Sequence, residues 1–134
     1  MIFLLDTNVL SEGQKRFPQS EVSAFFRSVP VENLRVSAVV VGEIAQGVEN
    51  NPMPDLKDVL ADVRAMLIAE FGEAEALEWG RMTSAALKAG HSLEMRDSMI
   101  AATAAVRGWT VATRNADDFR KLGVAVFNPW TDKL

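Results

Sequence analysis

Three acidic residues of this 134-residue chain stand where a carboxylate could take part in chemistry. Asp6 directly follows the apolar run 2–5, Glu43 lies inside a strongly apolar segment, and Asp97 precedes a run of small and apolar residues. Each also has an ordinary explanation, since Asp6 and Asp97 suit helix N-termini and Glu43 could be half of an ion pair. If the three side chains converge, their oxygens suit a hard cation such as Mg²⁺ or Mn²⁺.

The rest of the composition excludes most other kinds of reaction centre. The chain has no cysteine, which excludes disulfides and thiolate metal sites, and its single histidine, His91, excludes cleavage by a histidine pair. It contains no Gly-x-Ser-x-Gly turn, no glycine-rich phosphate loop and no dinucleotide-binding fingerprint. The chemistry that is left is metal-assisted hydrolysis of a phosphodiester. In this reaction two ions about 3.5–4 Å apart activate water and stabilise the leaving oxygen.

The net charge of −4 argues against a broad basic face for nucleic acid. A nuclease remains compatible with this charge, because a cluster of acids adds to the negative count and bound cations reverse the local sign. Four basic residues are candidates for guiding phosphates toward such a site: Lys15, Arg16, Arg96 and Arg114.

The hydrophobic pattern alternates short strands with helices along a single domain, residues 1–134. A continuous apolar run predicts a strand buried on both faces at 2–5, and further short strands are predicted at 34–36, 109–112 and 124–127. Helical spacing predicts helices after Asp6, at 21–28, 38–48, 56–71, 73–88 and 92–107, and around Phe119, with Ser37 and Ser92 as N-caps. The two long central helices look like an inserted hairpin. This order predicts a three-layer α/β/α sandwich around a mainly parallel sheet.

Small polar residues follow two of the predicted strands. They are Asp6-Thr7-Asn8 and Thr113-Arg114-Asn115. Ligands of open parallel sheets bind outside the carboxyl ends of the strands. We therefore expect both segments to lie at the functional edge of the sheet.

No segment of the sequence suggests a membrane or an export signal. No stretch approaches the roughly 20 apolar residues of a membrane span. The apolar run near Met1 is shorter than a signal-peptide core and has no basic flank. We expect a soluble cytoplasmic protein with no membrane association.

Five sequence blocks extend in order over nearly the whole chain. They are LLDTNVLSE at 4–12, the segment from Ser37 through GEI at 42–44 to Gly47, DSMIAATA at 97–104, VATRNADDF at 111–119 and VFNPW at 126–130. Together these blocks resemble the PIN-domain family, and more closely the VapC-type toxins of bacterial type II toxin–antitoxin pairs.

The resemblance implies a function as well as a fold. It implies a Mg²⁺- or Mn²⁺-dependent endoribonuclease in which Asp6, Glu43 and Asp97 match the catalytic, metal-binding acids of the family. It places these acids at the carboxyl end of a parallel sheet that is sandwiched by helices. It also implies a small antitoxin as protein partner, RNA as substrate, and a homodimer that the antitoxin holds in a larger complex.

One position departs from the family pattern. Some relatives carry a fourth acid where this chain has Asn115, and asparagine keeps a carbonyl ligand but loses the charge. A second metal ion is therefore expected to bind weakly or only with substrate, and Asp118, or as the second choice Asp117, to contribute through water. Thr7, Asn8 and Thr113 are expected to orient the carboxylates.

Two other functions compete with this interpretation. A phosphatase of the haloacid-dehalogenase type also begins with a strand followed by aspartate, but it needs a second acid two positions later, where this chain has Asn8. The other alternative is a catalytically silent module that only binds a partner. Phosphoenzyme trapping on Asp6 would support the first alternative, and a failure to bind Mn²⁺ would support the second.

Overall fold

A five-stranded parallel sheet forms the centre of the computed structural model, which describes residues 1–51 and 54–134. The strands are β1 (Phe3–Leu5), β2 (Leu34–Ser37), β3 (Leu67–Ala69), β4 (Thr110–Ala112) and β5 (Val126–Phe127), in the order β3-β2-β1-β4-β5. Every pairing between them is parallel. The carboxyl ends of all five strands therefore lie at one edge of the sheet.

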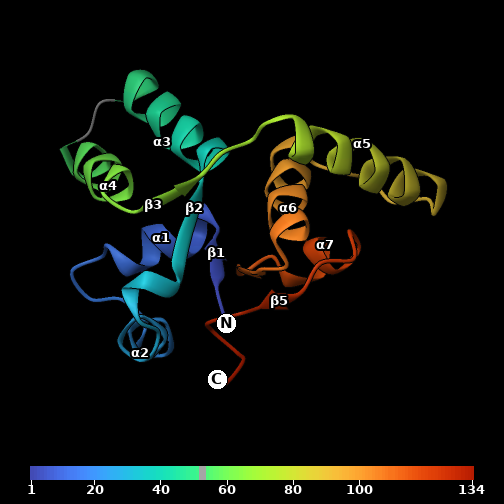
Figure 1. The fold of residues 1–134 in the computed structure, drawn as a ribbon. Helices are drawn as coiled ribbons and strands as arrows, with labels where there is room; N and C mark the ends of the chain where they lie inside the picture. The colour runs from blue at the N-terminus through green and yellow to red at the C-terminus, as the bar shows by residue number, and fades with distance from the viewer. Residues whose placement is uncertain (52–53) are drawn as a thin grey trace.

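Helices cover both faces of this sheet, as Figure 1 shows. On one side lie α1 (Thr7–Gly13), α2 (Ser20–Ser28), α3 (Ala38–Asn50) and α4 (Pro54–Arg64), and on the other α5 (Glu73–Lys88), α6 (Met95–Arg107) and α7 (Ala116–Arg120). A short 3₁₀ turn, Val31–Asn33, precedes β2. The predicted three-layer α/β/α sandwich is confirmed. None of the described helices is long and apolar enough to cross a membrane.

The central position of β1 explains its uninterrupted apolar sequence. This strand lies between β2 and β4, and its residues Leu4 and Leu5 have no exposed surface. A strand buried on both faces needs apolar side chains at every position. Helix α6 covers one face of the sheet, and its fully buried small residues Ala101 and Ala104 let it pack closely on the strands. Both features bring the residues that follow β1 and begin α6 toward the same edge.

The predicted helix at 56–71 is wrong in its second half. Helix α4 ends at Arg64, and Leu67–Ala69 forms the edge strand β3, in which Leu67 is aligned with Arg35 of β2. An apolar run of this length fits either a helical face or a strand, and pairing with β2 decides. The predicted hairpin is also absent from the described chain, because α4 packs on α3 whereas α5 packs on α6.

Two smaller predictions concern helix boundaries. Ser37 caps α3 as predicted, with its Oγ accepting a hydrogen bond from Val39 N at 3.1 Å. Ser92 does not cap α6, because that helix begins at Met95 with Glu94 at the N-cap position. The segment 50–54, which its asparagines and prolines predict to be a loop, includes positions 52 and 53, and these two lie outside the described residues.

Gly108 ends α6 in a left-handed conformation, with φ 69° and ψ 30°. Gly108→Ala is expected to lower the free energy of unfolding by about 1–2 kcal/mol, because a Cβ is strained in this conformation. Gly80→Ala is the matched control in the exposed middle of α5, where an added Cβ meets nothing within 4 Å. That variant should gain about 0.5–1 kcal/mol. Urea unfolding that shifts both variants in the same direction would contradict this account of Gly108.

Candidate active site

Asp6 lies at the carboxyl end of β1 and caps the helix that follows. Its backbone N–H donates to Ala112 O at 2.9 Å, which extends the pairing between β1 and β4 by one residue. Its Oδ1 accepts a hydrogen bond from Thr7 N at 2.8 Å, the N-cap contact of α1. The side chain is buried, and the N-cap contact uses only one of its two carboxylate oxygens, Oδ1. Asp6 can therefore cap α1 and still face a ligand.

The polar segments after β1 and β4 are joined through side chains. Thr113 Oγ1 donates to Asp6 Oδ2 at 2.7 Å, and Asn8 Nδ2 donates to the same oxygen at 3.3 Å. Asn8 Oδ1 in turn accepts from the backbone N–H of Arg114 at 3.2 Å. Thr113 is fully buried, so its hydroxyl has a fixed partner. These contacts hold the Asp6 carboxylate in one orientation.

Asp97 stands in the first turn of α6 and is 6% exposed. Burial, together with the negative charges of Asp6, Glu94 and Asp118, raises the pKa of Asp97 to about 6, against the lowering effect of Arg96. The carboxylates of Asp6 and Asp97 are thus near enough to repel each other. Such repulsion between buried acids is characteristic of a site built for a cation.

Glu43 extends from α3 toward the same region. Its Oε2 lies 2.9 Å from Arg96 Nε but has no hydrogen-bond donor of good geometry. Burial raises the pKa of Glu43, as does the charge of Asp6, whereas Arg96 and the Thr7 hydroxyl lower it. The Thr7 hydroxyl is itself buried without a well-aligned partner. The Glu43 end of the site therefore contains two polar atoms that are not fully satisfied.

The three acids share an electrostatic environment in which Arg96 is the basic residue that lowers the pKa of each. Burial is also the main cause of the raised pKa of Asp6, opposed by hydrogen bonds from Thr113 and Thr7. The oxygen donors fit a hard divalent cation, and Glu43 Oε2 has no well-aligned hydrogen-bond donor. Within the described chain, however, no three acids or histidines lie close enough to hold a metal ion as they stand. Asp6 and Asp97 form the core of the site, and Glu43 lies against Arg96.

Comparison with known proteins shows to which family the chain belongs. The chain matches the sequence model of the PIN domain over residues 3–125. The chain belongs to the PIN-domain family. The toxin FitB of Neisseria gonorrhoeae is 35% identical to this PIN domain, over 98% of the chain and 100% of FitB. The VapC ribonuclease Y4jK of Sinorhizobium fredii is 28% identical, over 96% of the chain and 98% of its own length.

A solved structure shares the whole architecture of this PIN domain. The crystal structure of FitAcB from Neisseria gonorrhoeae has a TM-score of 0.84 and 34% identity, over 97% of this chain and 99% of the matched one. The family predicted from the sequence blocks is confirmed, and its relatives include VapC-type toxins.

Asn115 and Asp118 lie at the rim of the PIN-domain site. The backbone N–H of Asn115 donates to Thr113 Oγ1 at 3.0 Å, while the Asn115 side chain is exposed and makes no cap contact. Asp118 acts on the pKa of Asp97, although its own side chain is 65% exposed. The neighbouring Asp117 pairs with Arg120 at 2.9 Å and is 91% exposed. Of the two adjacent aspartates, Asp118 is the one that acts on the site.

A cavity of about 350 Å³ opens beside Asp97. Its walls include Glu94, Asp97, Asp118 and Lys121. Sequence reasoning missed Glu94 and Lys121 as members of the site, because an isolated acid or lysine near a short helix has no local signal. Of the three predicted acids, Asp97 is the one that lines this cavity.

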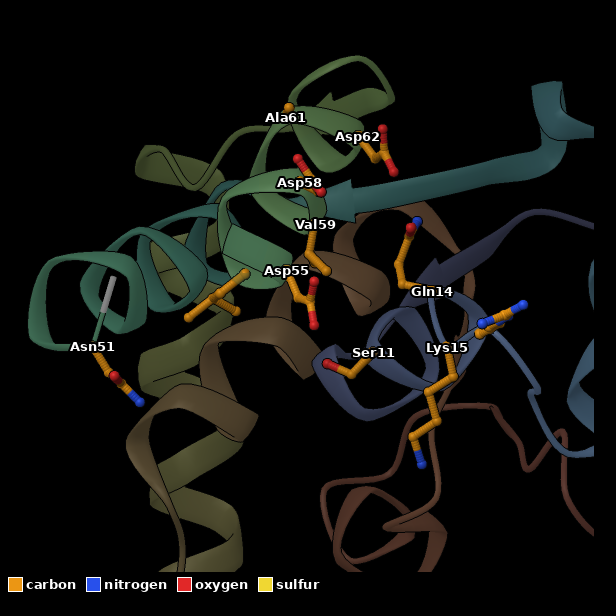
Figure 2. A pocket seen from close by; sticks show the side chains of 11 residues that line it. Ser11, Gln14, Lys15, Asn51, Asp55, Asp58, Val59, Ala61 and Asp62 are labelled. Atoms are coloured by element: carbon orange, nitrogen blue, oxygen red, sulfur yellow. The ribbon is translucent and has the colours of Figure 1, made fainter. Parts of the chain in front are cut away.

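A larger cavity of about 940 Å³ lies between α1 and α4 (Figure 2). Asp55, Asp58 and Asp62 of α4 line it, and Lys15 lies across from them. None of its lining residues belongs to the carboxylate site. Two of the predicted phosphate guides, Lys15 and Arg16, line this cavity and not the one beside Asp97.

Thr113→Val tests whether the Thr113 hydroxyl orients Asp6. The variant leaves a buried carboxylate oxygen short of a donor, so the free energy of unfolding should fall by about 1–3 kcal/mol. Loss of a contact that orients a ligand should weaken Mn²⁺ binding by about tenfold. Thr103→Val is the control, because this buried hydroxyl donates to Met99 O within α6. Equal Mn²⁺ affinity in both variants, measured by calorimetry, would contradict the orienting role.

Proposed function

We propose that this PIN domain is a Mg²⁺- or Mn²⁺-dependent endoribonuclease that hydrolyses RNA phosphodiester bonds. The observation that carries the proposal is the gathering of buried acids with raised pKa values, Asp6 and Asp97, at the carboxyl end of the sheet. The choice of RNA is supported by a ribonuclease among the relatives. The choice of a divalent cation is supported by the all-oxygen donor set.

The residues of the site have different roles in this proposal. Asp6 and Asp97 would hold the principal ion, and Glu43 would complete the cluster by ligation or by orienting the attacking water. A bound divalent ion supplies an activated water and a counter-charge for the leaving oxygen. Thr113 and Asn8 keep Asp6 in its orientation through hydrogen bonds of 2.7 and 3.3 Å. Thr7 contributes its backbone N–H to Asp6 and its hydroxyl to the surroundings of Glu43.

The rim offers positive groups for the RNA backbone. Lys121 lines the cavity beside Asp97 and is half exposed, so its ammonium group can reach a phosphate that enters there. Arg114 lies over the ring of Trp130, with Cζ 5.0 Å from the centroid, while its backbone is tied to Asn8. A guanidinium held in this way is placed beside the site.

We further propose that the protein is the toxin of a toxin–antitoxin pair that acts in the cytoplasm. Its partner would be a small antitoxin, and the toxin would form a homodimer within the larger complex. This part of the proposal rests on the relatives reported above, among them toxin FitB. Co-expression with the product of a short neighbouring reading frame should yield a stable complex.

Incubation of the purified protein with total RNA tests the catalytic proposal. We expect endonucleolytic fragments with Mg²⁺ or Mn²⁺, no fragments with excess EDTA, and recovery when Mn²⁺ is restored. Asp6→Asn serves as the negative control, because asparagine keeps the N-cap contact of α1. Cleavage that persists in EDTA, or in the Asp6→Asn protein, would contradict the proposal. Absence of Mn²⁺ binding at millimolar concentration would favour a silent interaction module.

A further inference from the structure

Among the ion pairs of the described chain, Arg96 is the only basic residue paired with one of the three acids Asp6, Glu43 and Asp97. Its Nε lies 2.9 Å from Glu43 Oε2, and its Nη2 lies 2.6 Å from Glu94 Oε1. Arg96 directly precedes Asp97, so its side chain reaches from the first turn of α6 across to α3. One guanidinium thus connects the two helices that carry Asp97 and Glu43.

The charge of Arg96 reaches all three acids of the site. It lowers the pKa of Asp6, of Glu43 and of Asp97, and so opposes the effect of burial on each of them. An arginine stays protonated at any physiological pH, so this positive charge is permanent. In the absence of a metal ion, Arg96 is the counter-charge of the cluster.

The contact with Glu43 engages an oxygen that a metal ion would need. Glu43 Oε2 is buried, and Arg96 Nε approaches it at 2.9 Å without the alignment of a hydrogen bond. The close approach occupies the space in front of the oxygen, yet the poor alignment makes the contact easy to give up. A cation that uses this oxygen must therefore displace the Arg96 guanidinium.

The Arg96 side chain has open space around it. Its side chain is 43% exposed, and its second partner, Glu94, is 57% exposed on the solvent side. A groove of about 580 Å³ lies beside the contact, lined by Gly42, Glu43 and Arg96 among others. An added Cβ at Gly42 would meet nothing within 4 Å, so the space next to Glu43 is open. The guanidinium therefore has open, solvent-facing space beside it into which it can move.

We propose that Arg96 is a built-in counter-ion that competes with the divalent cation for Glu43 Oε2 and thereby sets the metal affinity of the site. This inference rests on the proposed function, since it assumes that a cation binds among the acids. Cation binding then requires Arg96 to leave Glu43, and the residue weakens metal binding while it stabilises the metal-free protein. A residue that merely held Glu43 in place would have the opposite effect on metal affinity.

Titration calorimetry with Mn²⁺ on the full-length protein, without RNA, tests this proposal. Arg96→Met should bind Mn²⁺ about fivefold more tightly than the wild type, from the loss of one competing partly exposed pair. Arg96→Lys keeps the charge but lacks Nε, and its affinity should fall between the two. Arg81→Met is the matched control, because Arg81 pairs with Glu78 on the exposed face of α5; its affinity should equal the wild-type value.

The same variants in a Glu43→Gln background isolate the contact itself. There the Arg96→Met substitution should change Mn²⁺ affinity less than it does in the wild-type background, because the competition for Glu43 Oε2 is gone and only the effect of the Arg96 charge on Asp6 and Asp97 remains. An Arg96→Met protein with unchanged or weaker affinity would overturn the proposal, as would an Arg96→Lys protein identical to the wild type. If the wild type itself binds no Mn²⁺, the proposed function fails first; if it binds and the variants do not differ, only the role of Arg96 fails.

Discussion

Asp97→Asn is expected to reduce RNA cleavage by about 10²–10³-fold while it raises the melting temperature of the metal-free protein. The activity falls because the variant removes a charged ligand from the centre of the site. The stability rises because the Asp97 carboxylate is buried close to Asp6 and Glu94, and its pKa is raised to about 6. At neutral pH the ionised form therefore destabilises the fold, by at most about 3 kcal/mol.

The pH dependence of stability follows from the same shift. The folded-state pKa of Asp97, about 6, lies above its ordinary value of 3.8, so the folded protein binds more protons than the unfolded chain between these values. Stability from this group is fully present below 3.8 and is lost as the pH rises through 6. The raised pKa values of Asp6 and Glu43 act in the same direction.

This expectation is checked by melting temperatures measured by fluorimetry without metal from pH 3.5 to 8, a range of about two pH units on either side of the transition. The decline should be shallower in Asp97→Asn than in the wild type. Asp117→Asn is the matched control, because this aspartate is 91% exposed and pairs only with Arg120 among the described residues. A lower melting temperature in Asp97→Asn would mean that lost activity reflects lost folding, and the assignment of Asp97 would fail.

Mn²⁺ is expected to raise the melting temperature of the wild-type protein by roughly 10 °C at a hundredfold excess over its dissociation constant. Binding to the folded state alone contributes about 2.7 kcal/mol under these conditions, and a domain of this size gains about 4 °C per kcal/mol. Relief of the repulsion between Asp6 and Asp97 is part of that binding energy. Excess EDTA should reverse the whole shift.

The Asp6→Asn protein decides where this stabilisation arises. Asparagine retains the N-cap contact of α1, so the variant should fold, which circular dichroism checks. Its melting temperature should respond little to Mn²⁺, whereas Asp117→Asn should respond like the wild type. An undiminished Mn²⁺ response in Asp6→Asn would show that the cation binds elsewhere on the protein.

Much of the fold could be predicted from local sequence because local physics specifies it. The apolar run before Asp6 can only be a strand buried on both faces, Ser37 is a strong N-cap, and Gly108 supplies the left-handed residue that ends α6. Strand β3 could not be predicted in this way. Its residues Leu67 and Ile68 also fit a helical face, and only the exposed edge of β2 makes them a strand.

The site was predictable to different degrees at its three acids. Asp6 and Asp97 stand next to a strand end and a helix start, and the parallel topology brings such positions to one edge. Glu43 has no such signal, since an acid within an apolar helix has many explanations. Its prediction as a metal-binding acid depends on the resemblance to the PIN-domain family. Arg96 was expected to guide phosphates, and its contact with Glu43 depends on how α3 and α6 pack.

The most direct test of the central claim is the anomalous scattering of manganese in crystals of the wild-type protein grown with Mn²⁺. The account predicts a peak bound to carboxylate oxygens of both Asp6 and Asp97, at the carboxyl end of β1. A peak that touches neither residue, in a protein that cleaves RNA with Mn²⁺, would contradict it.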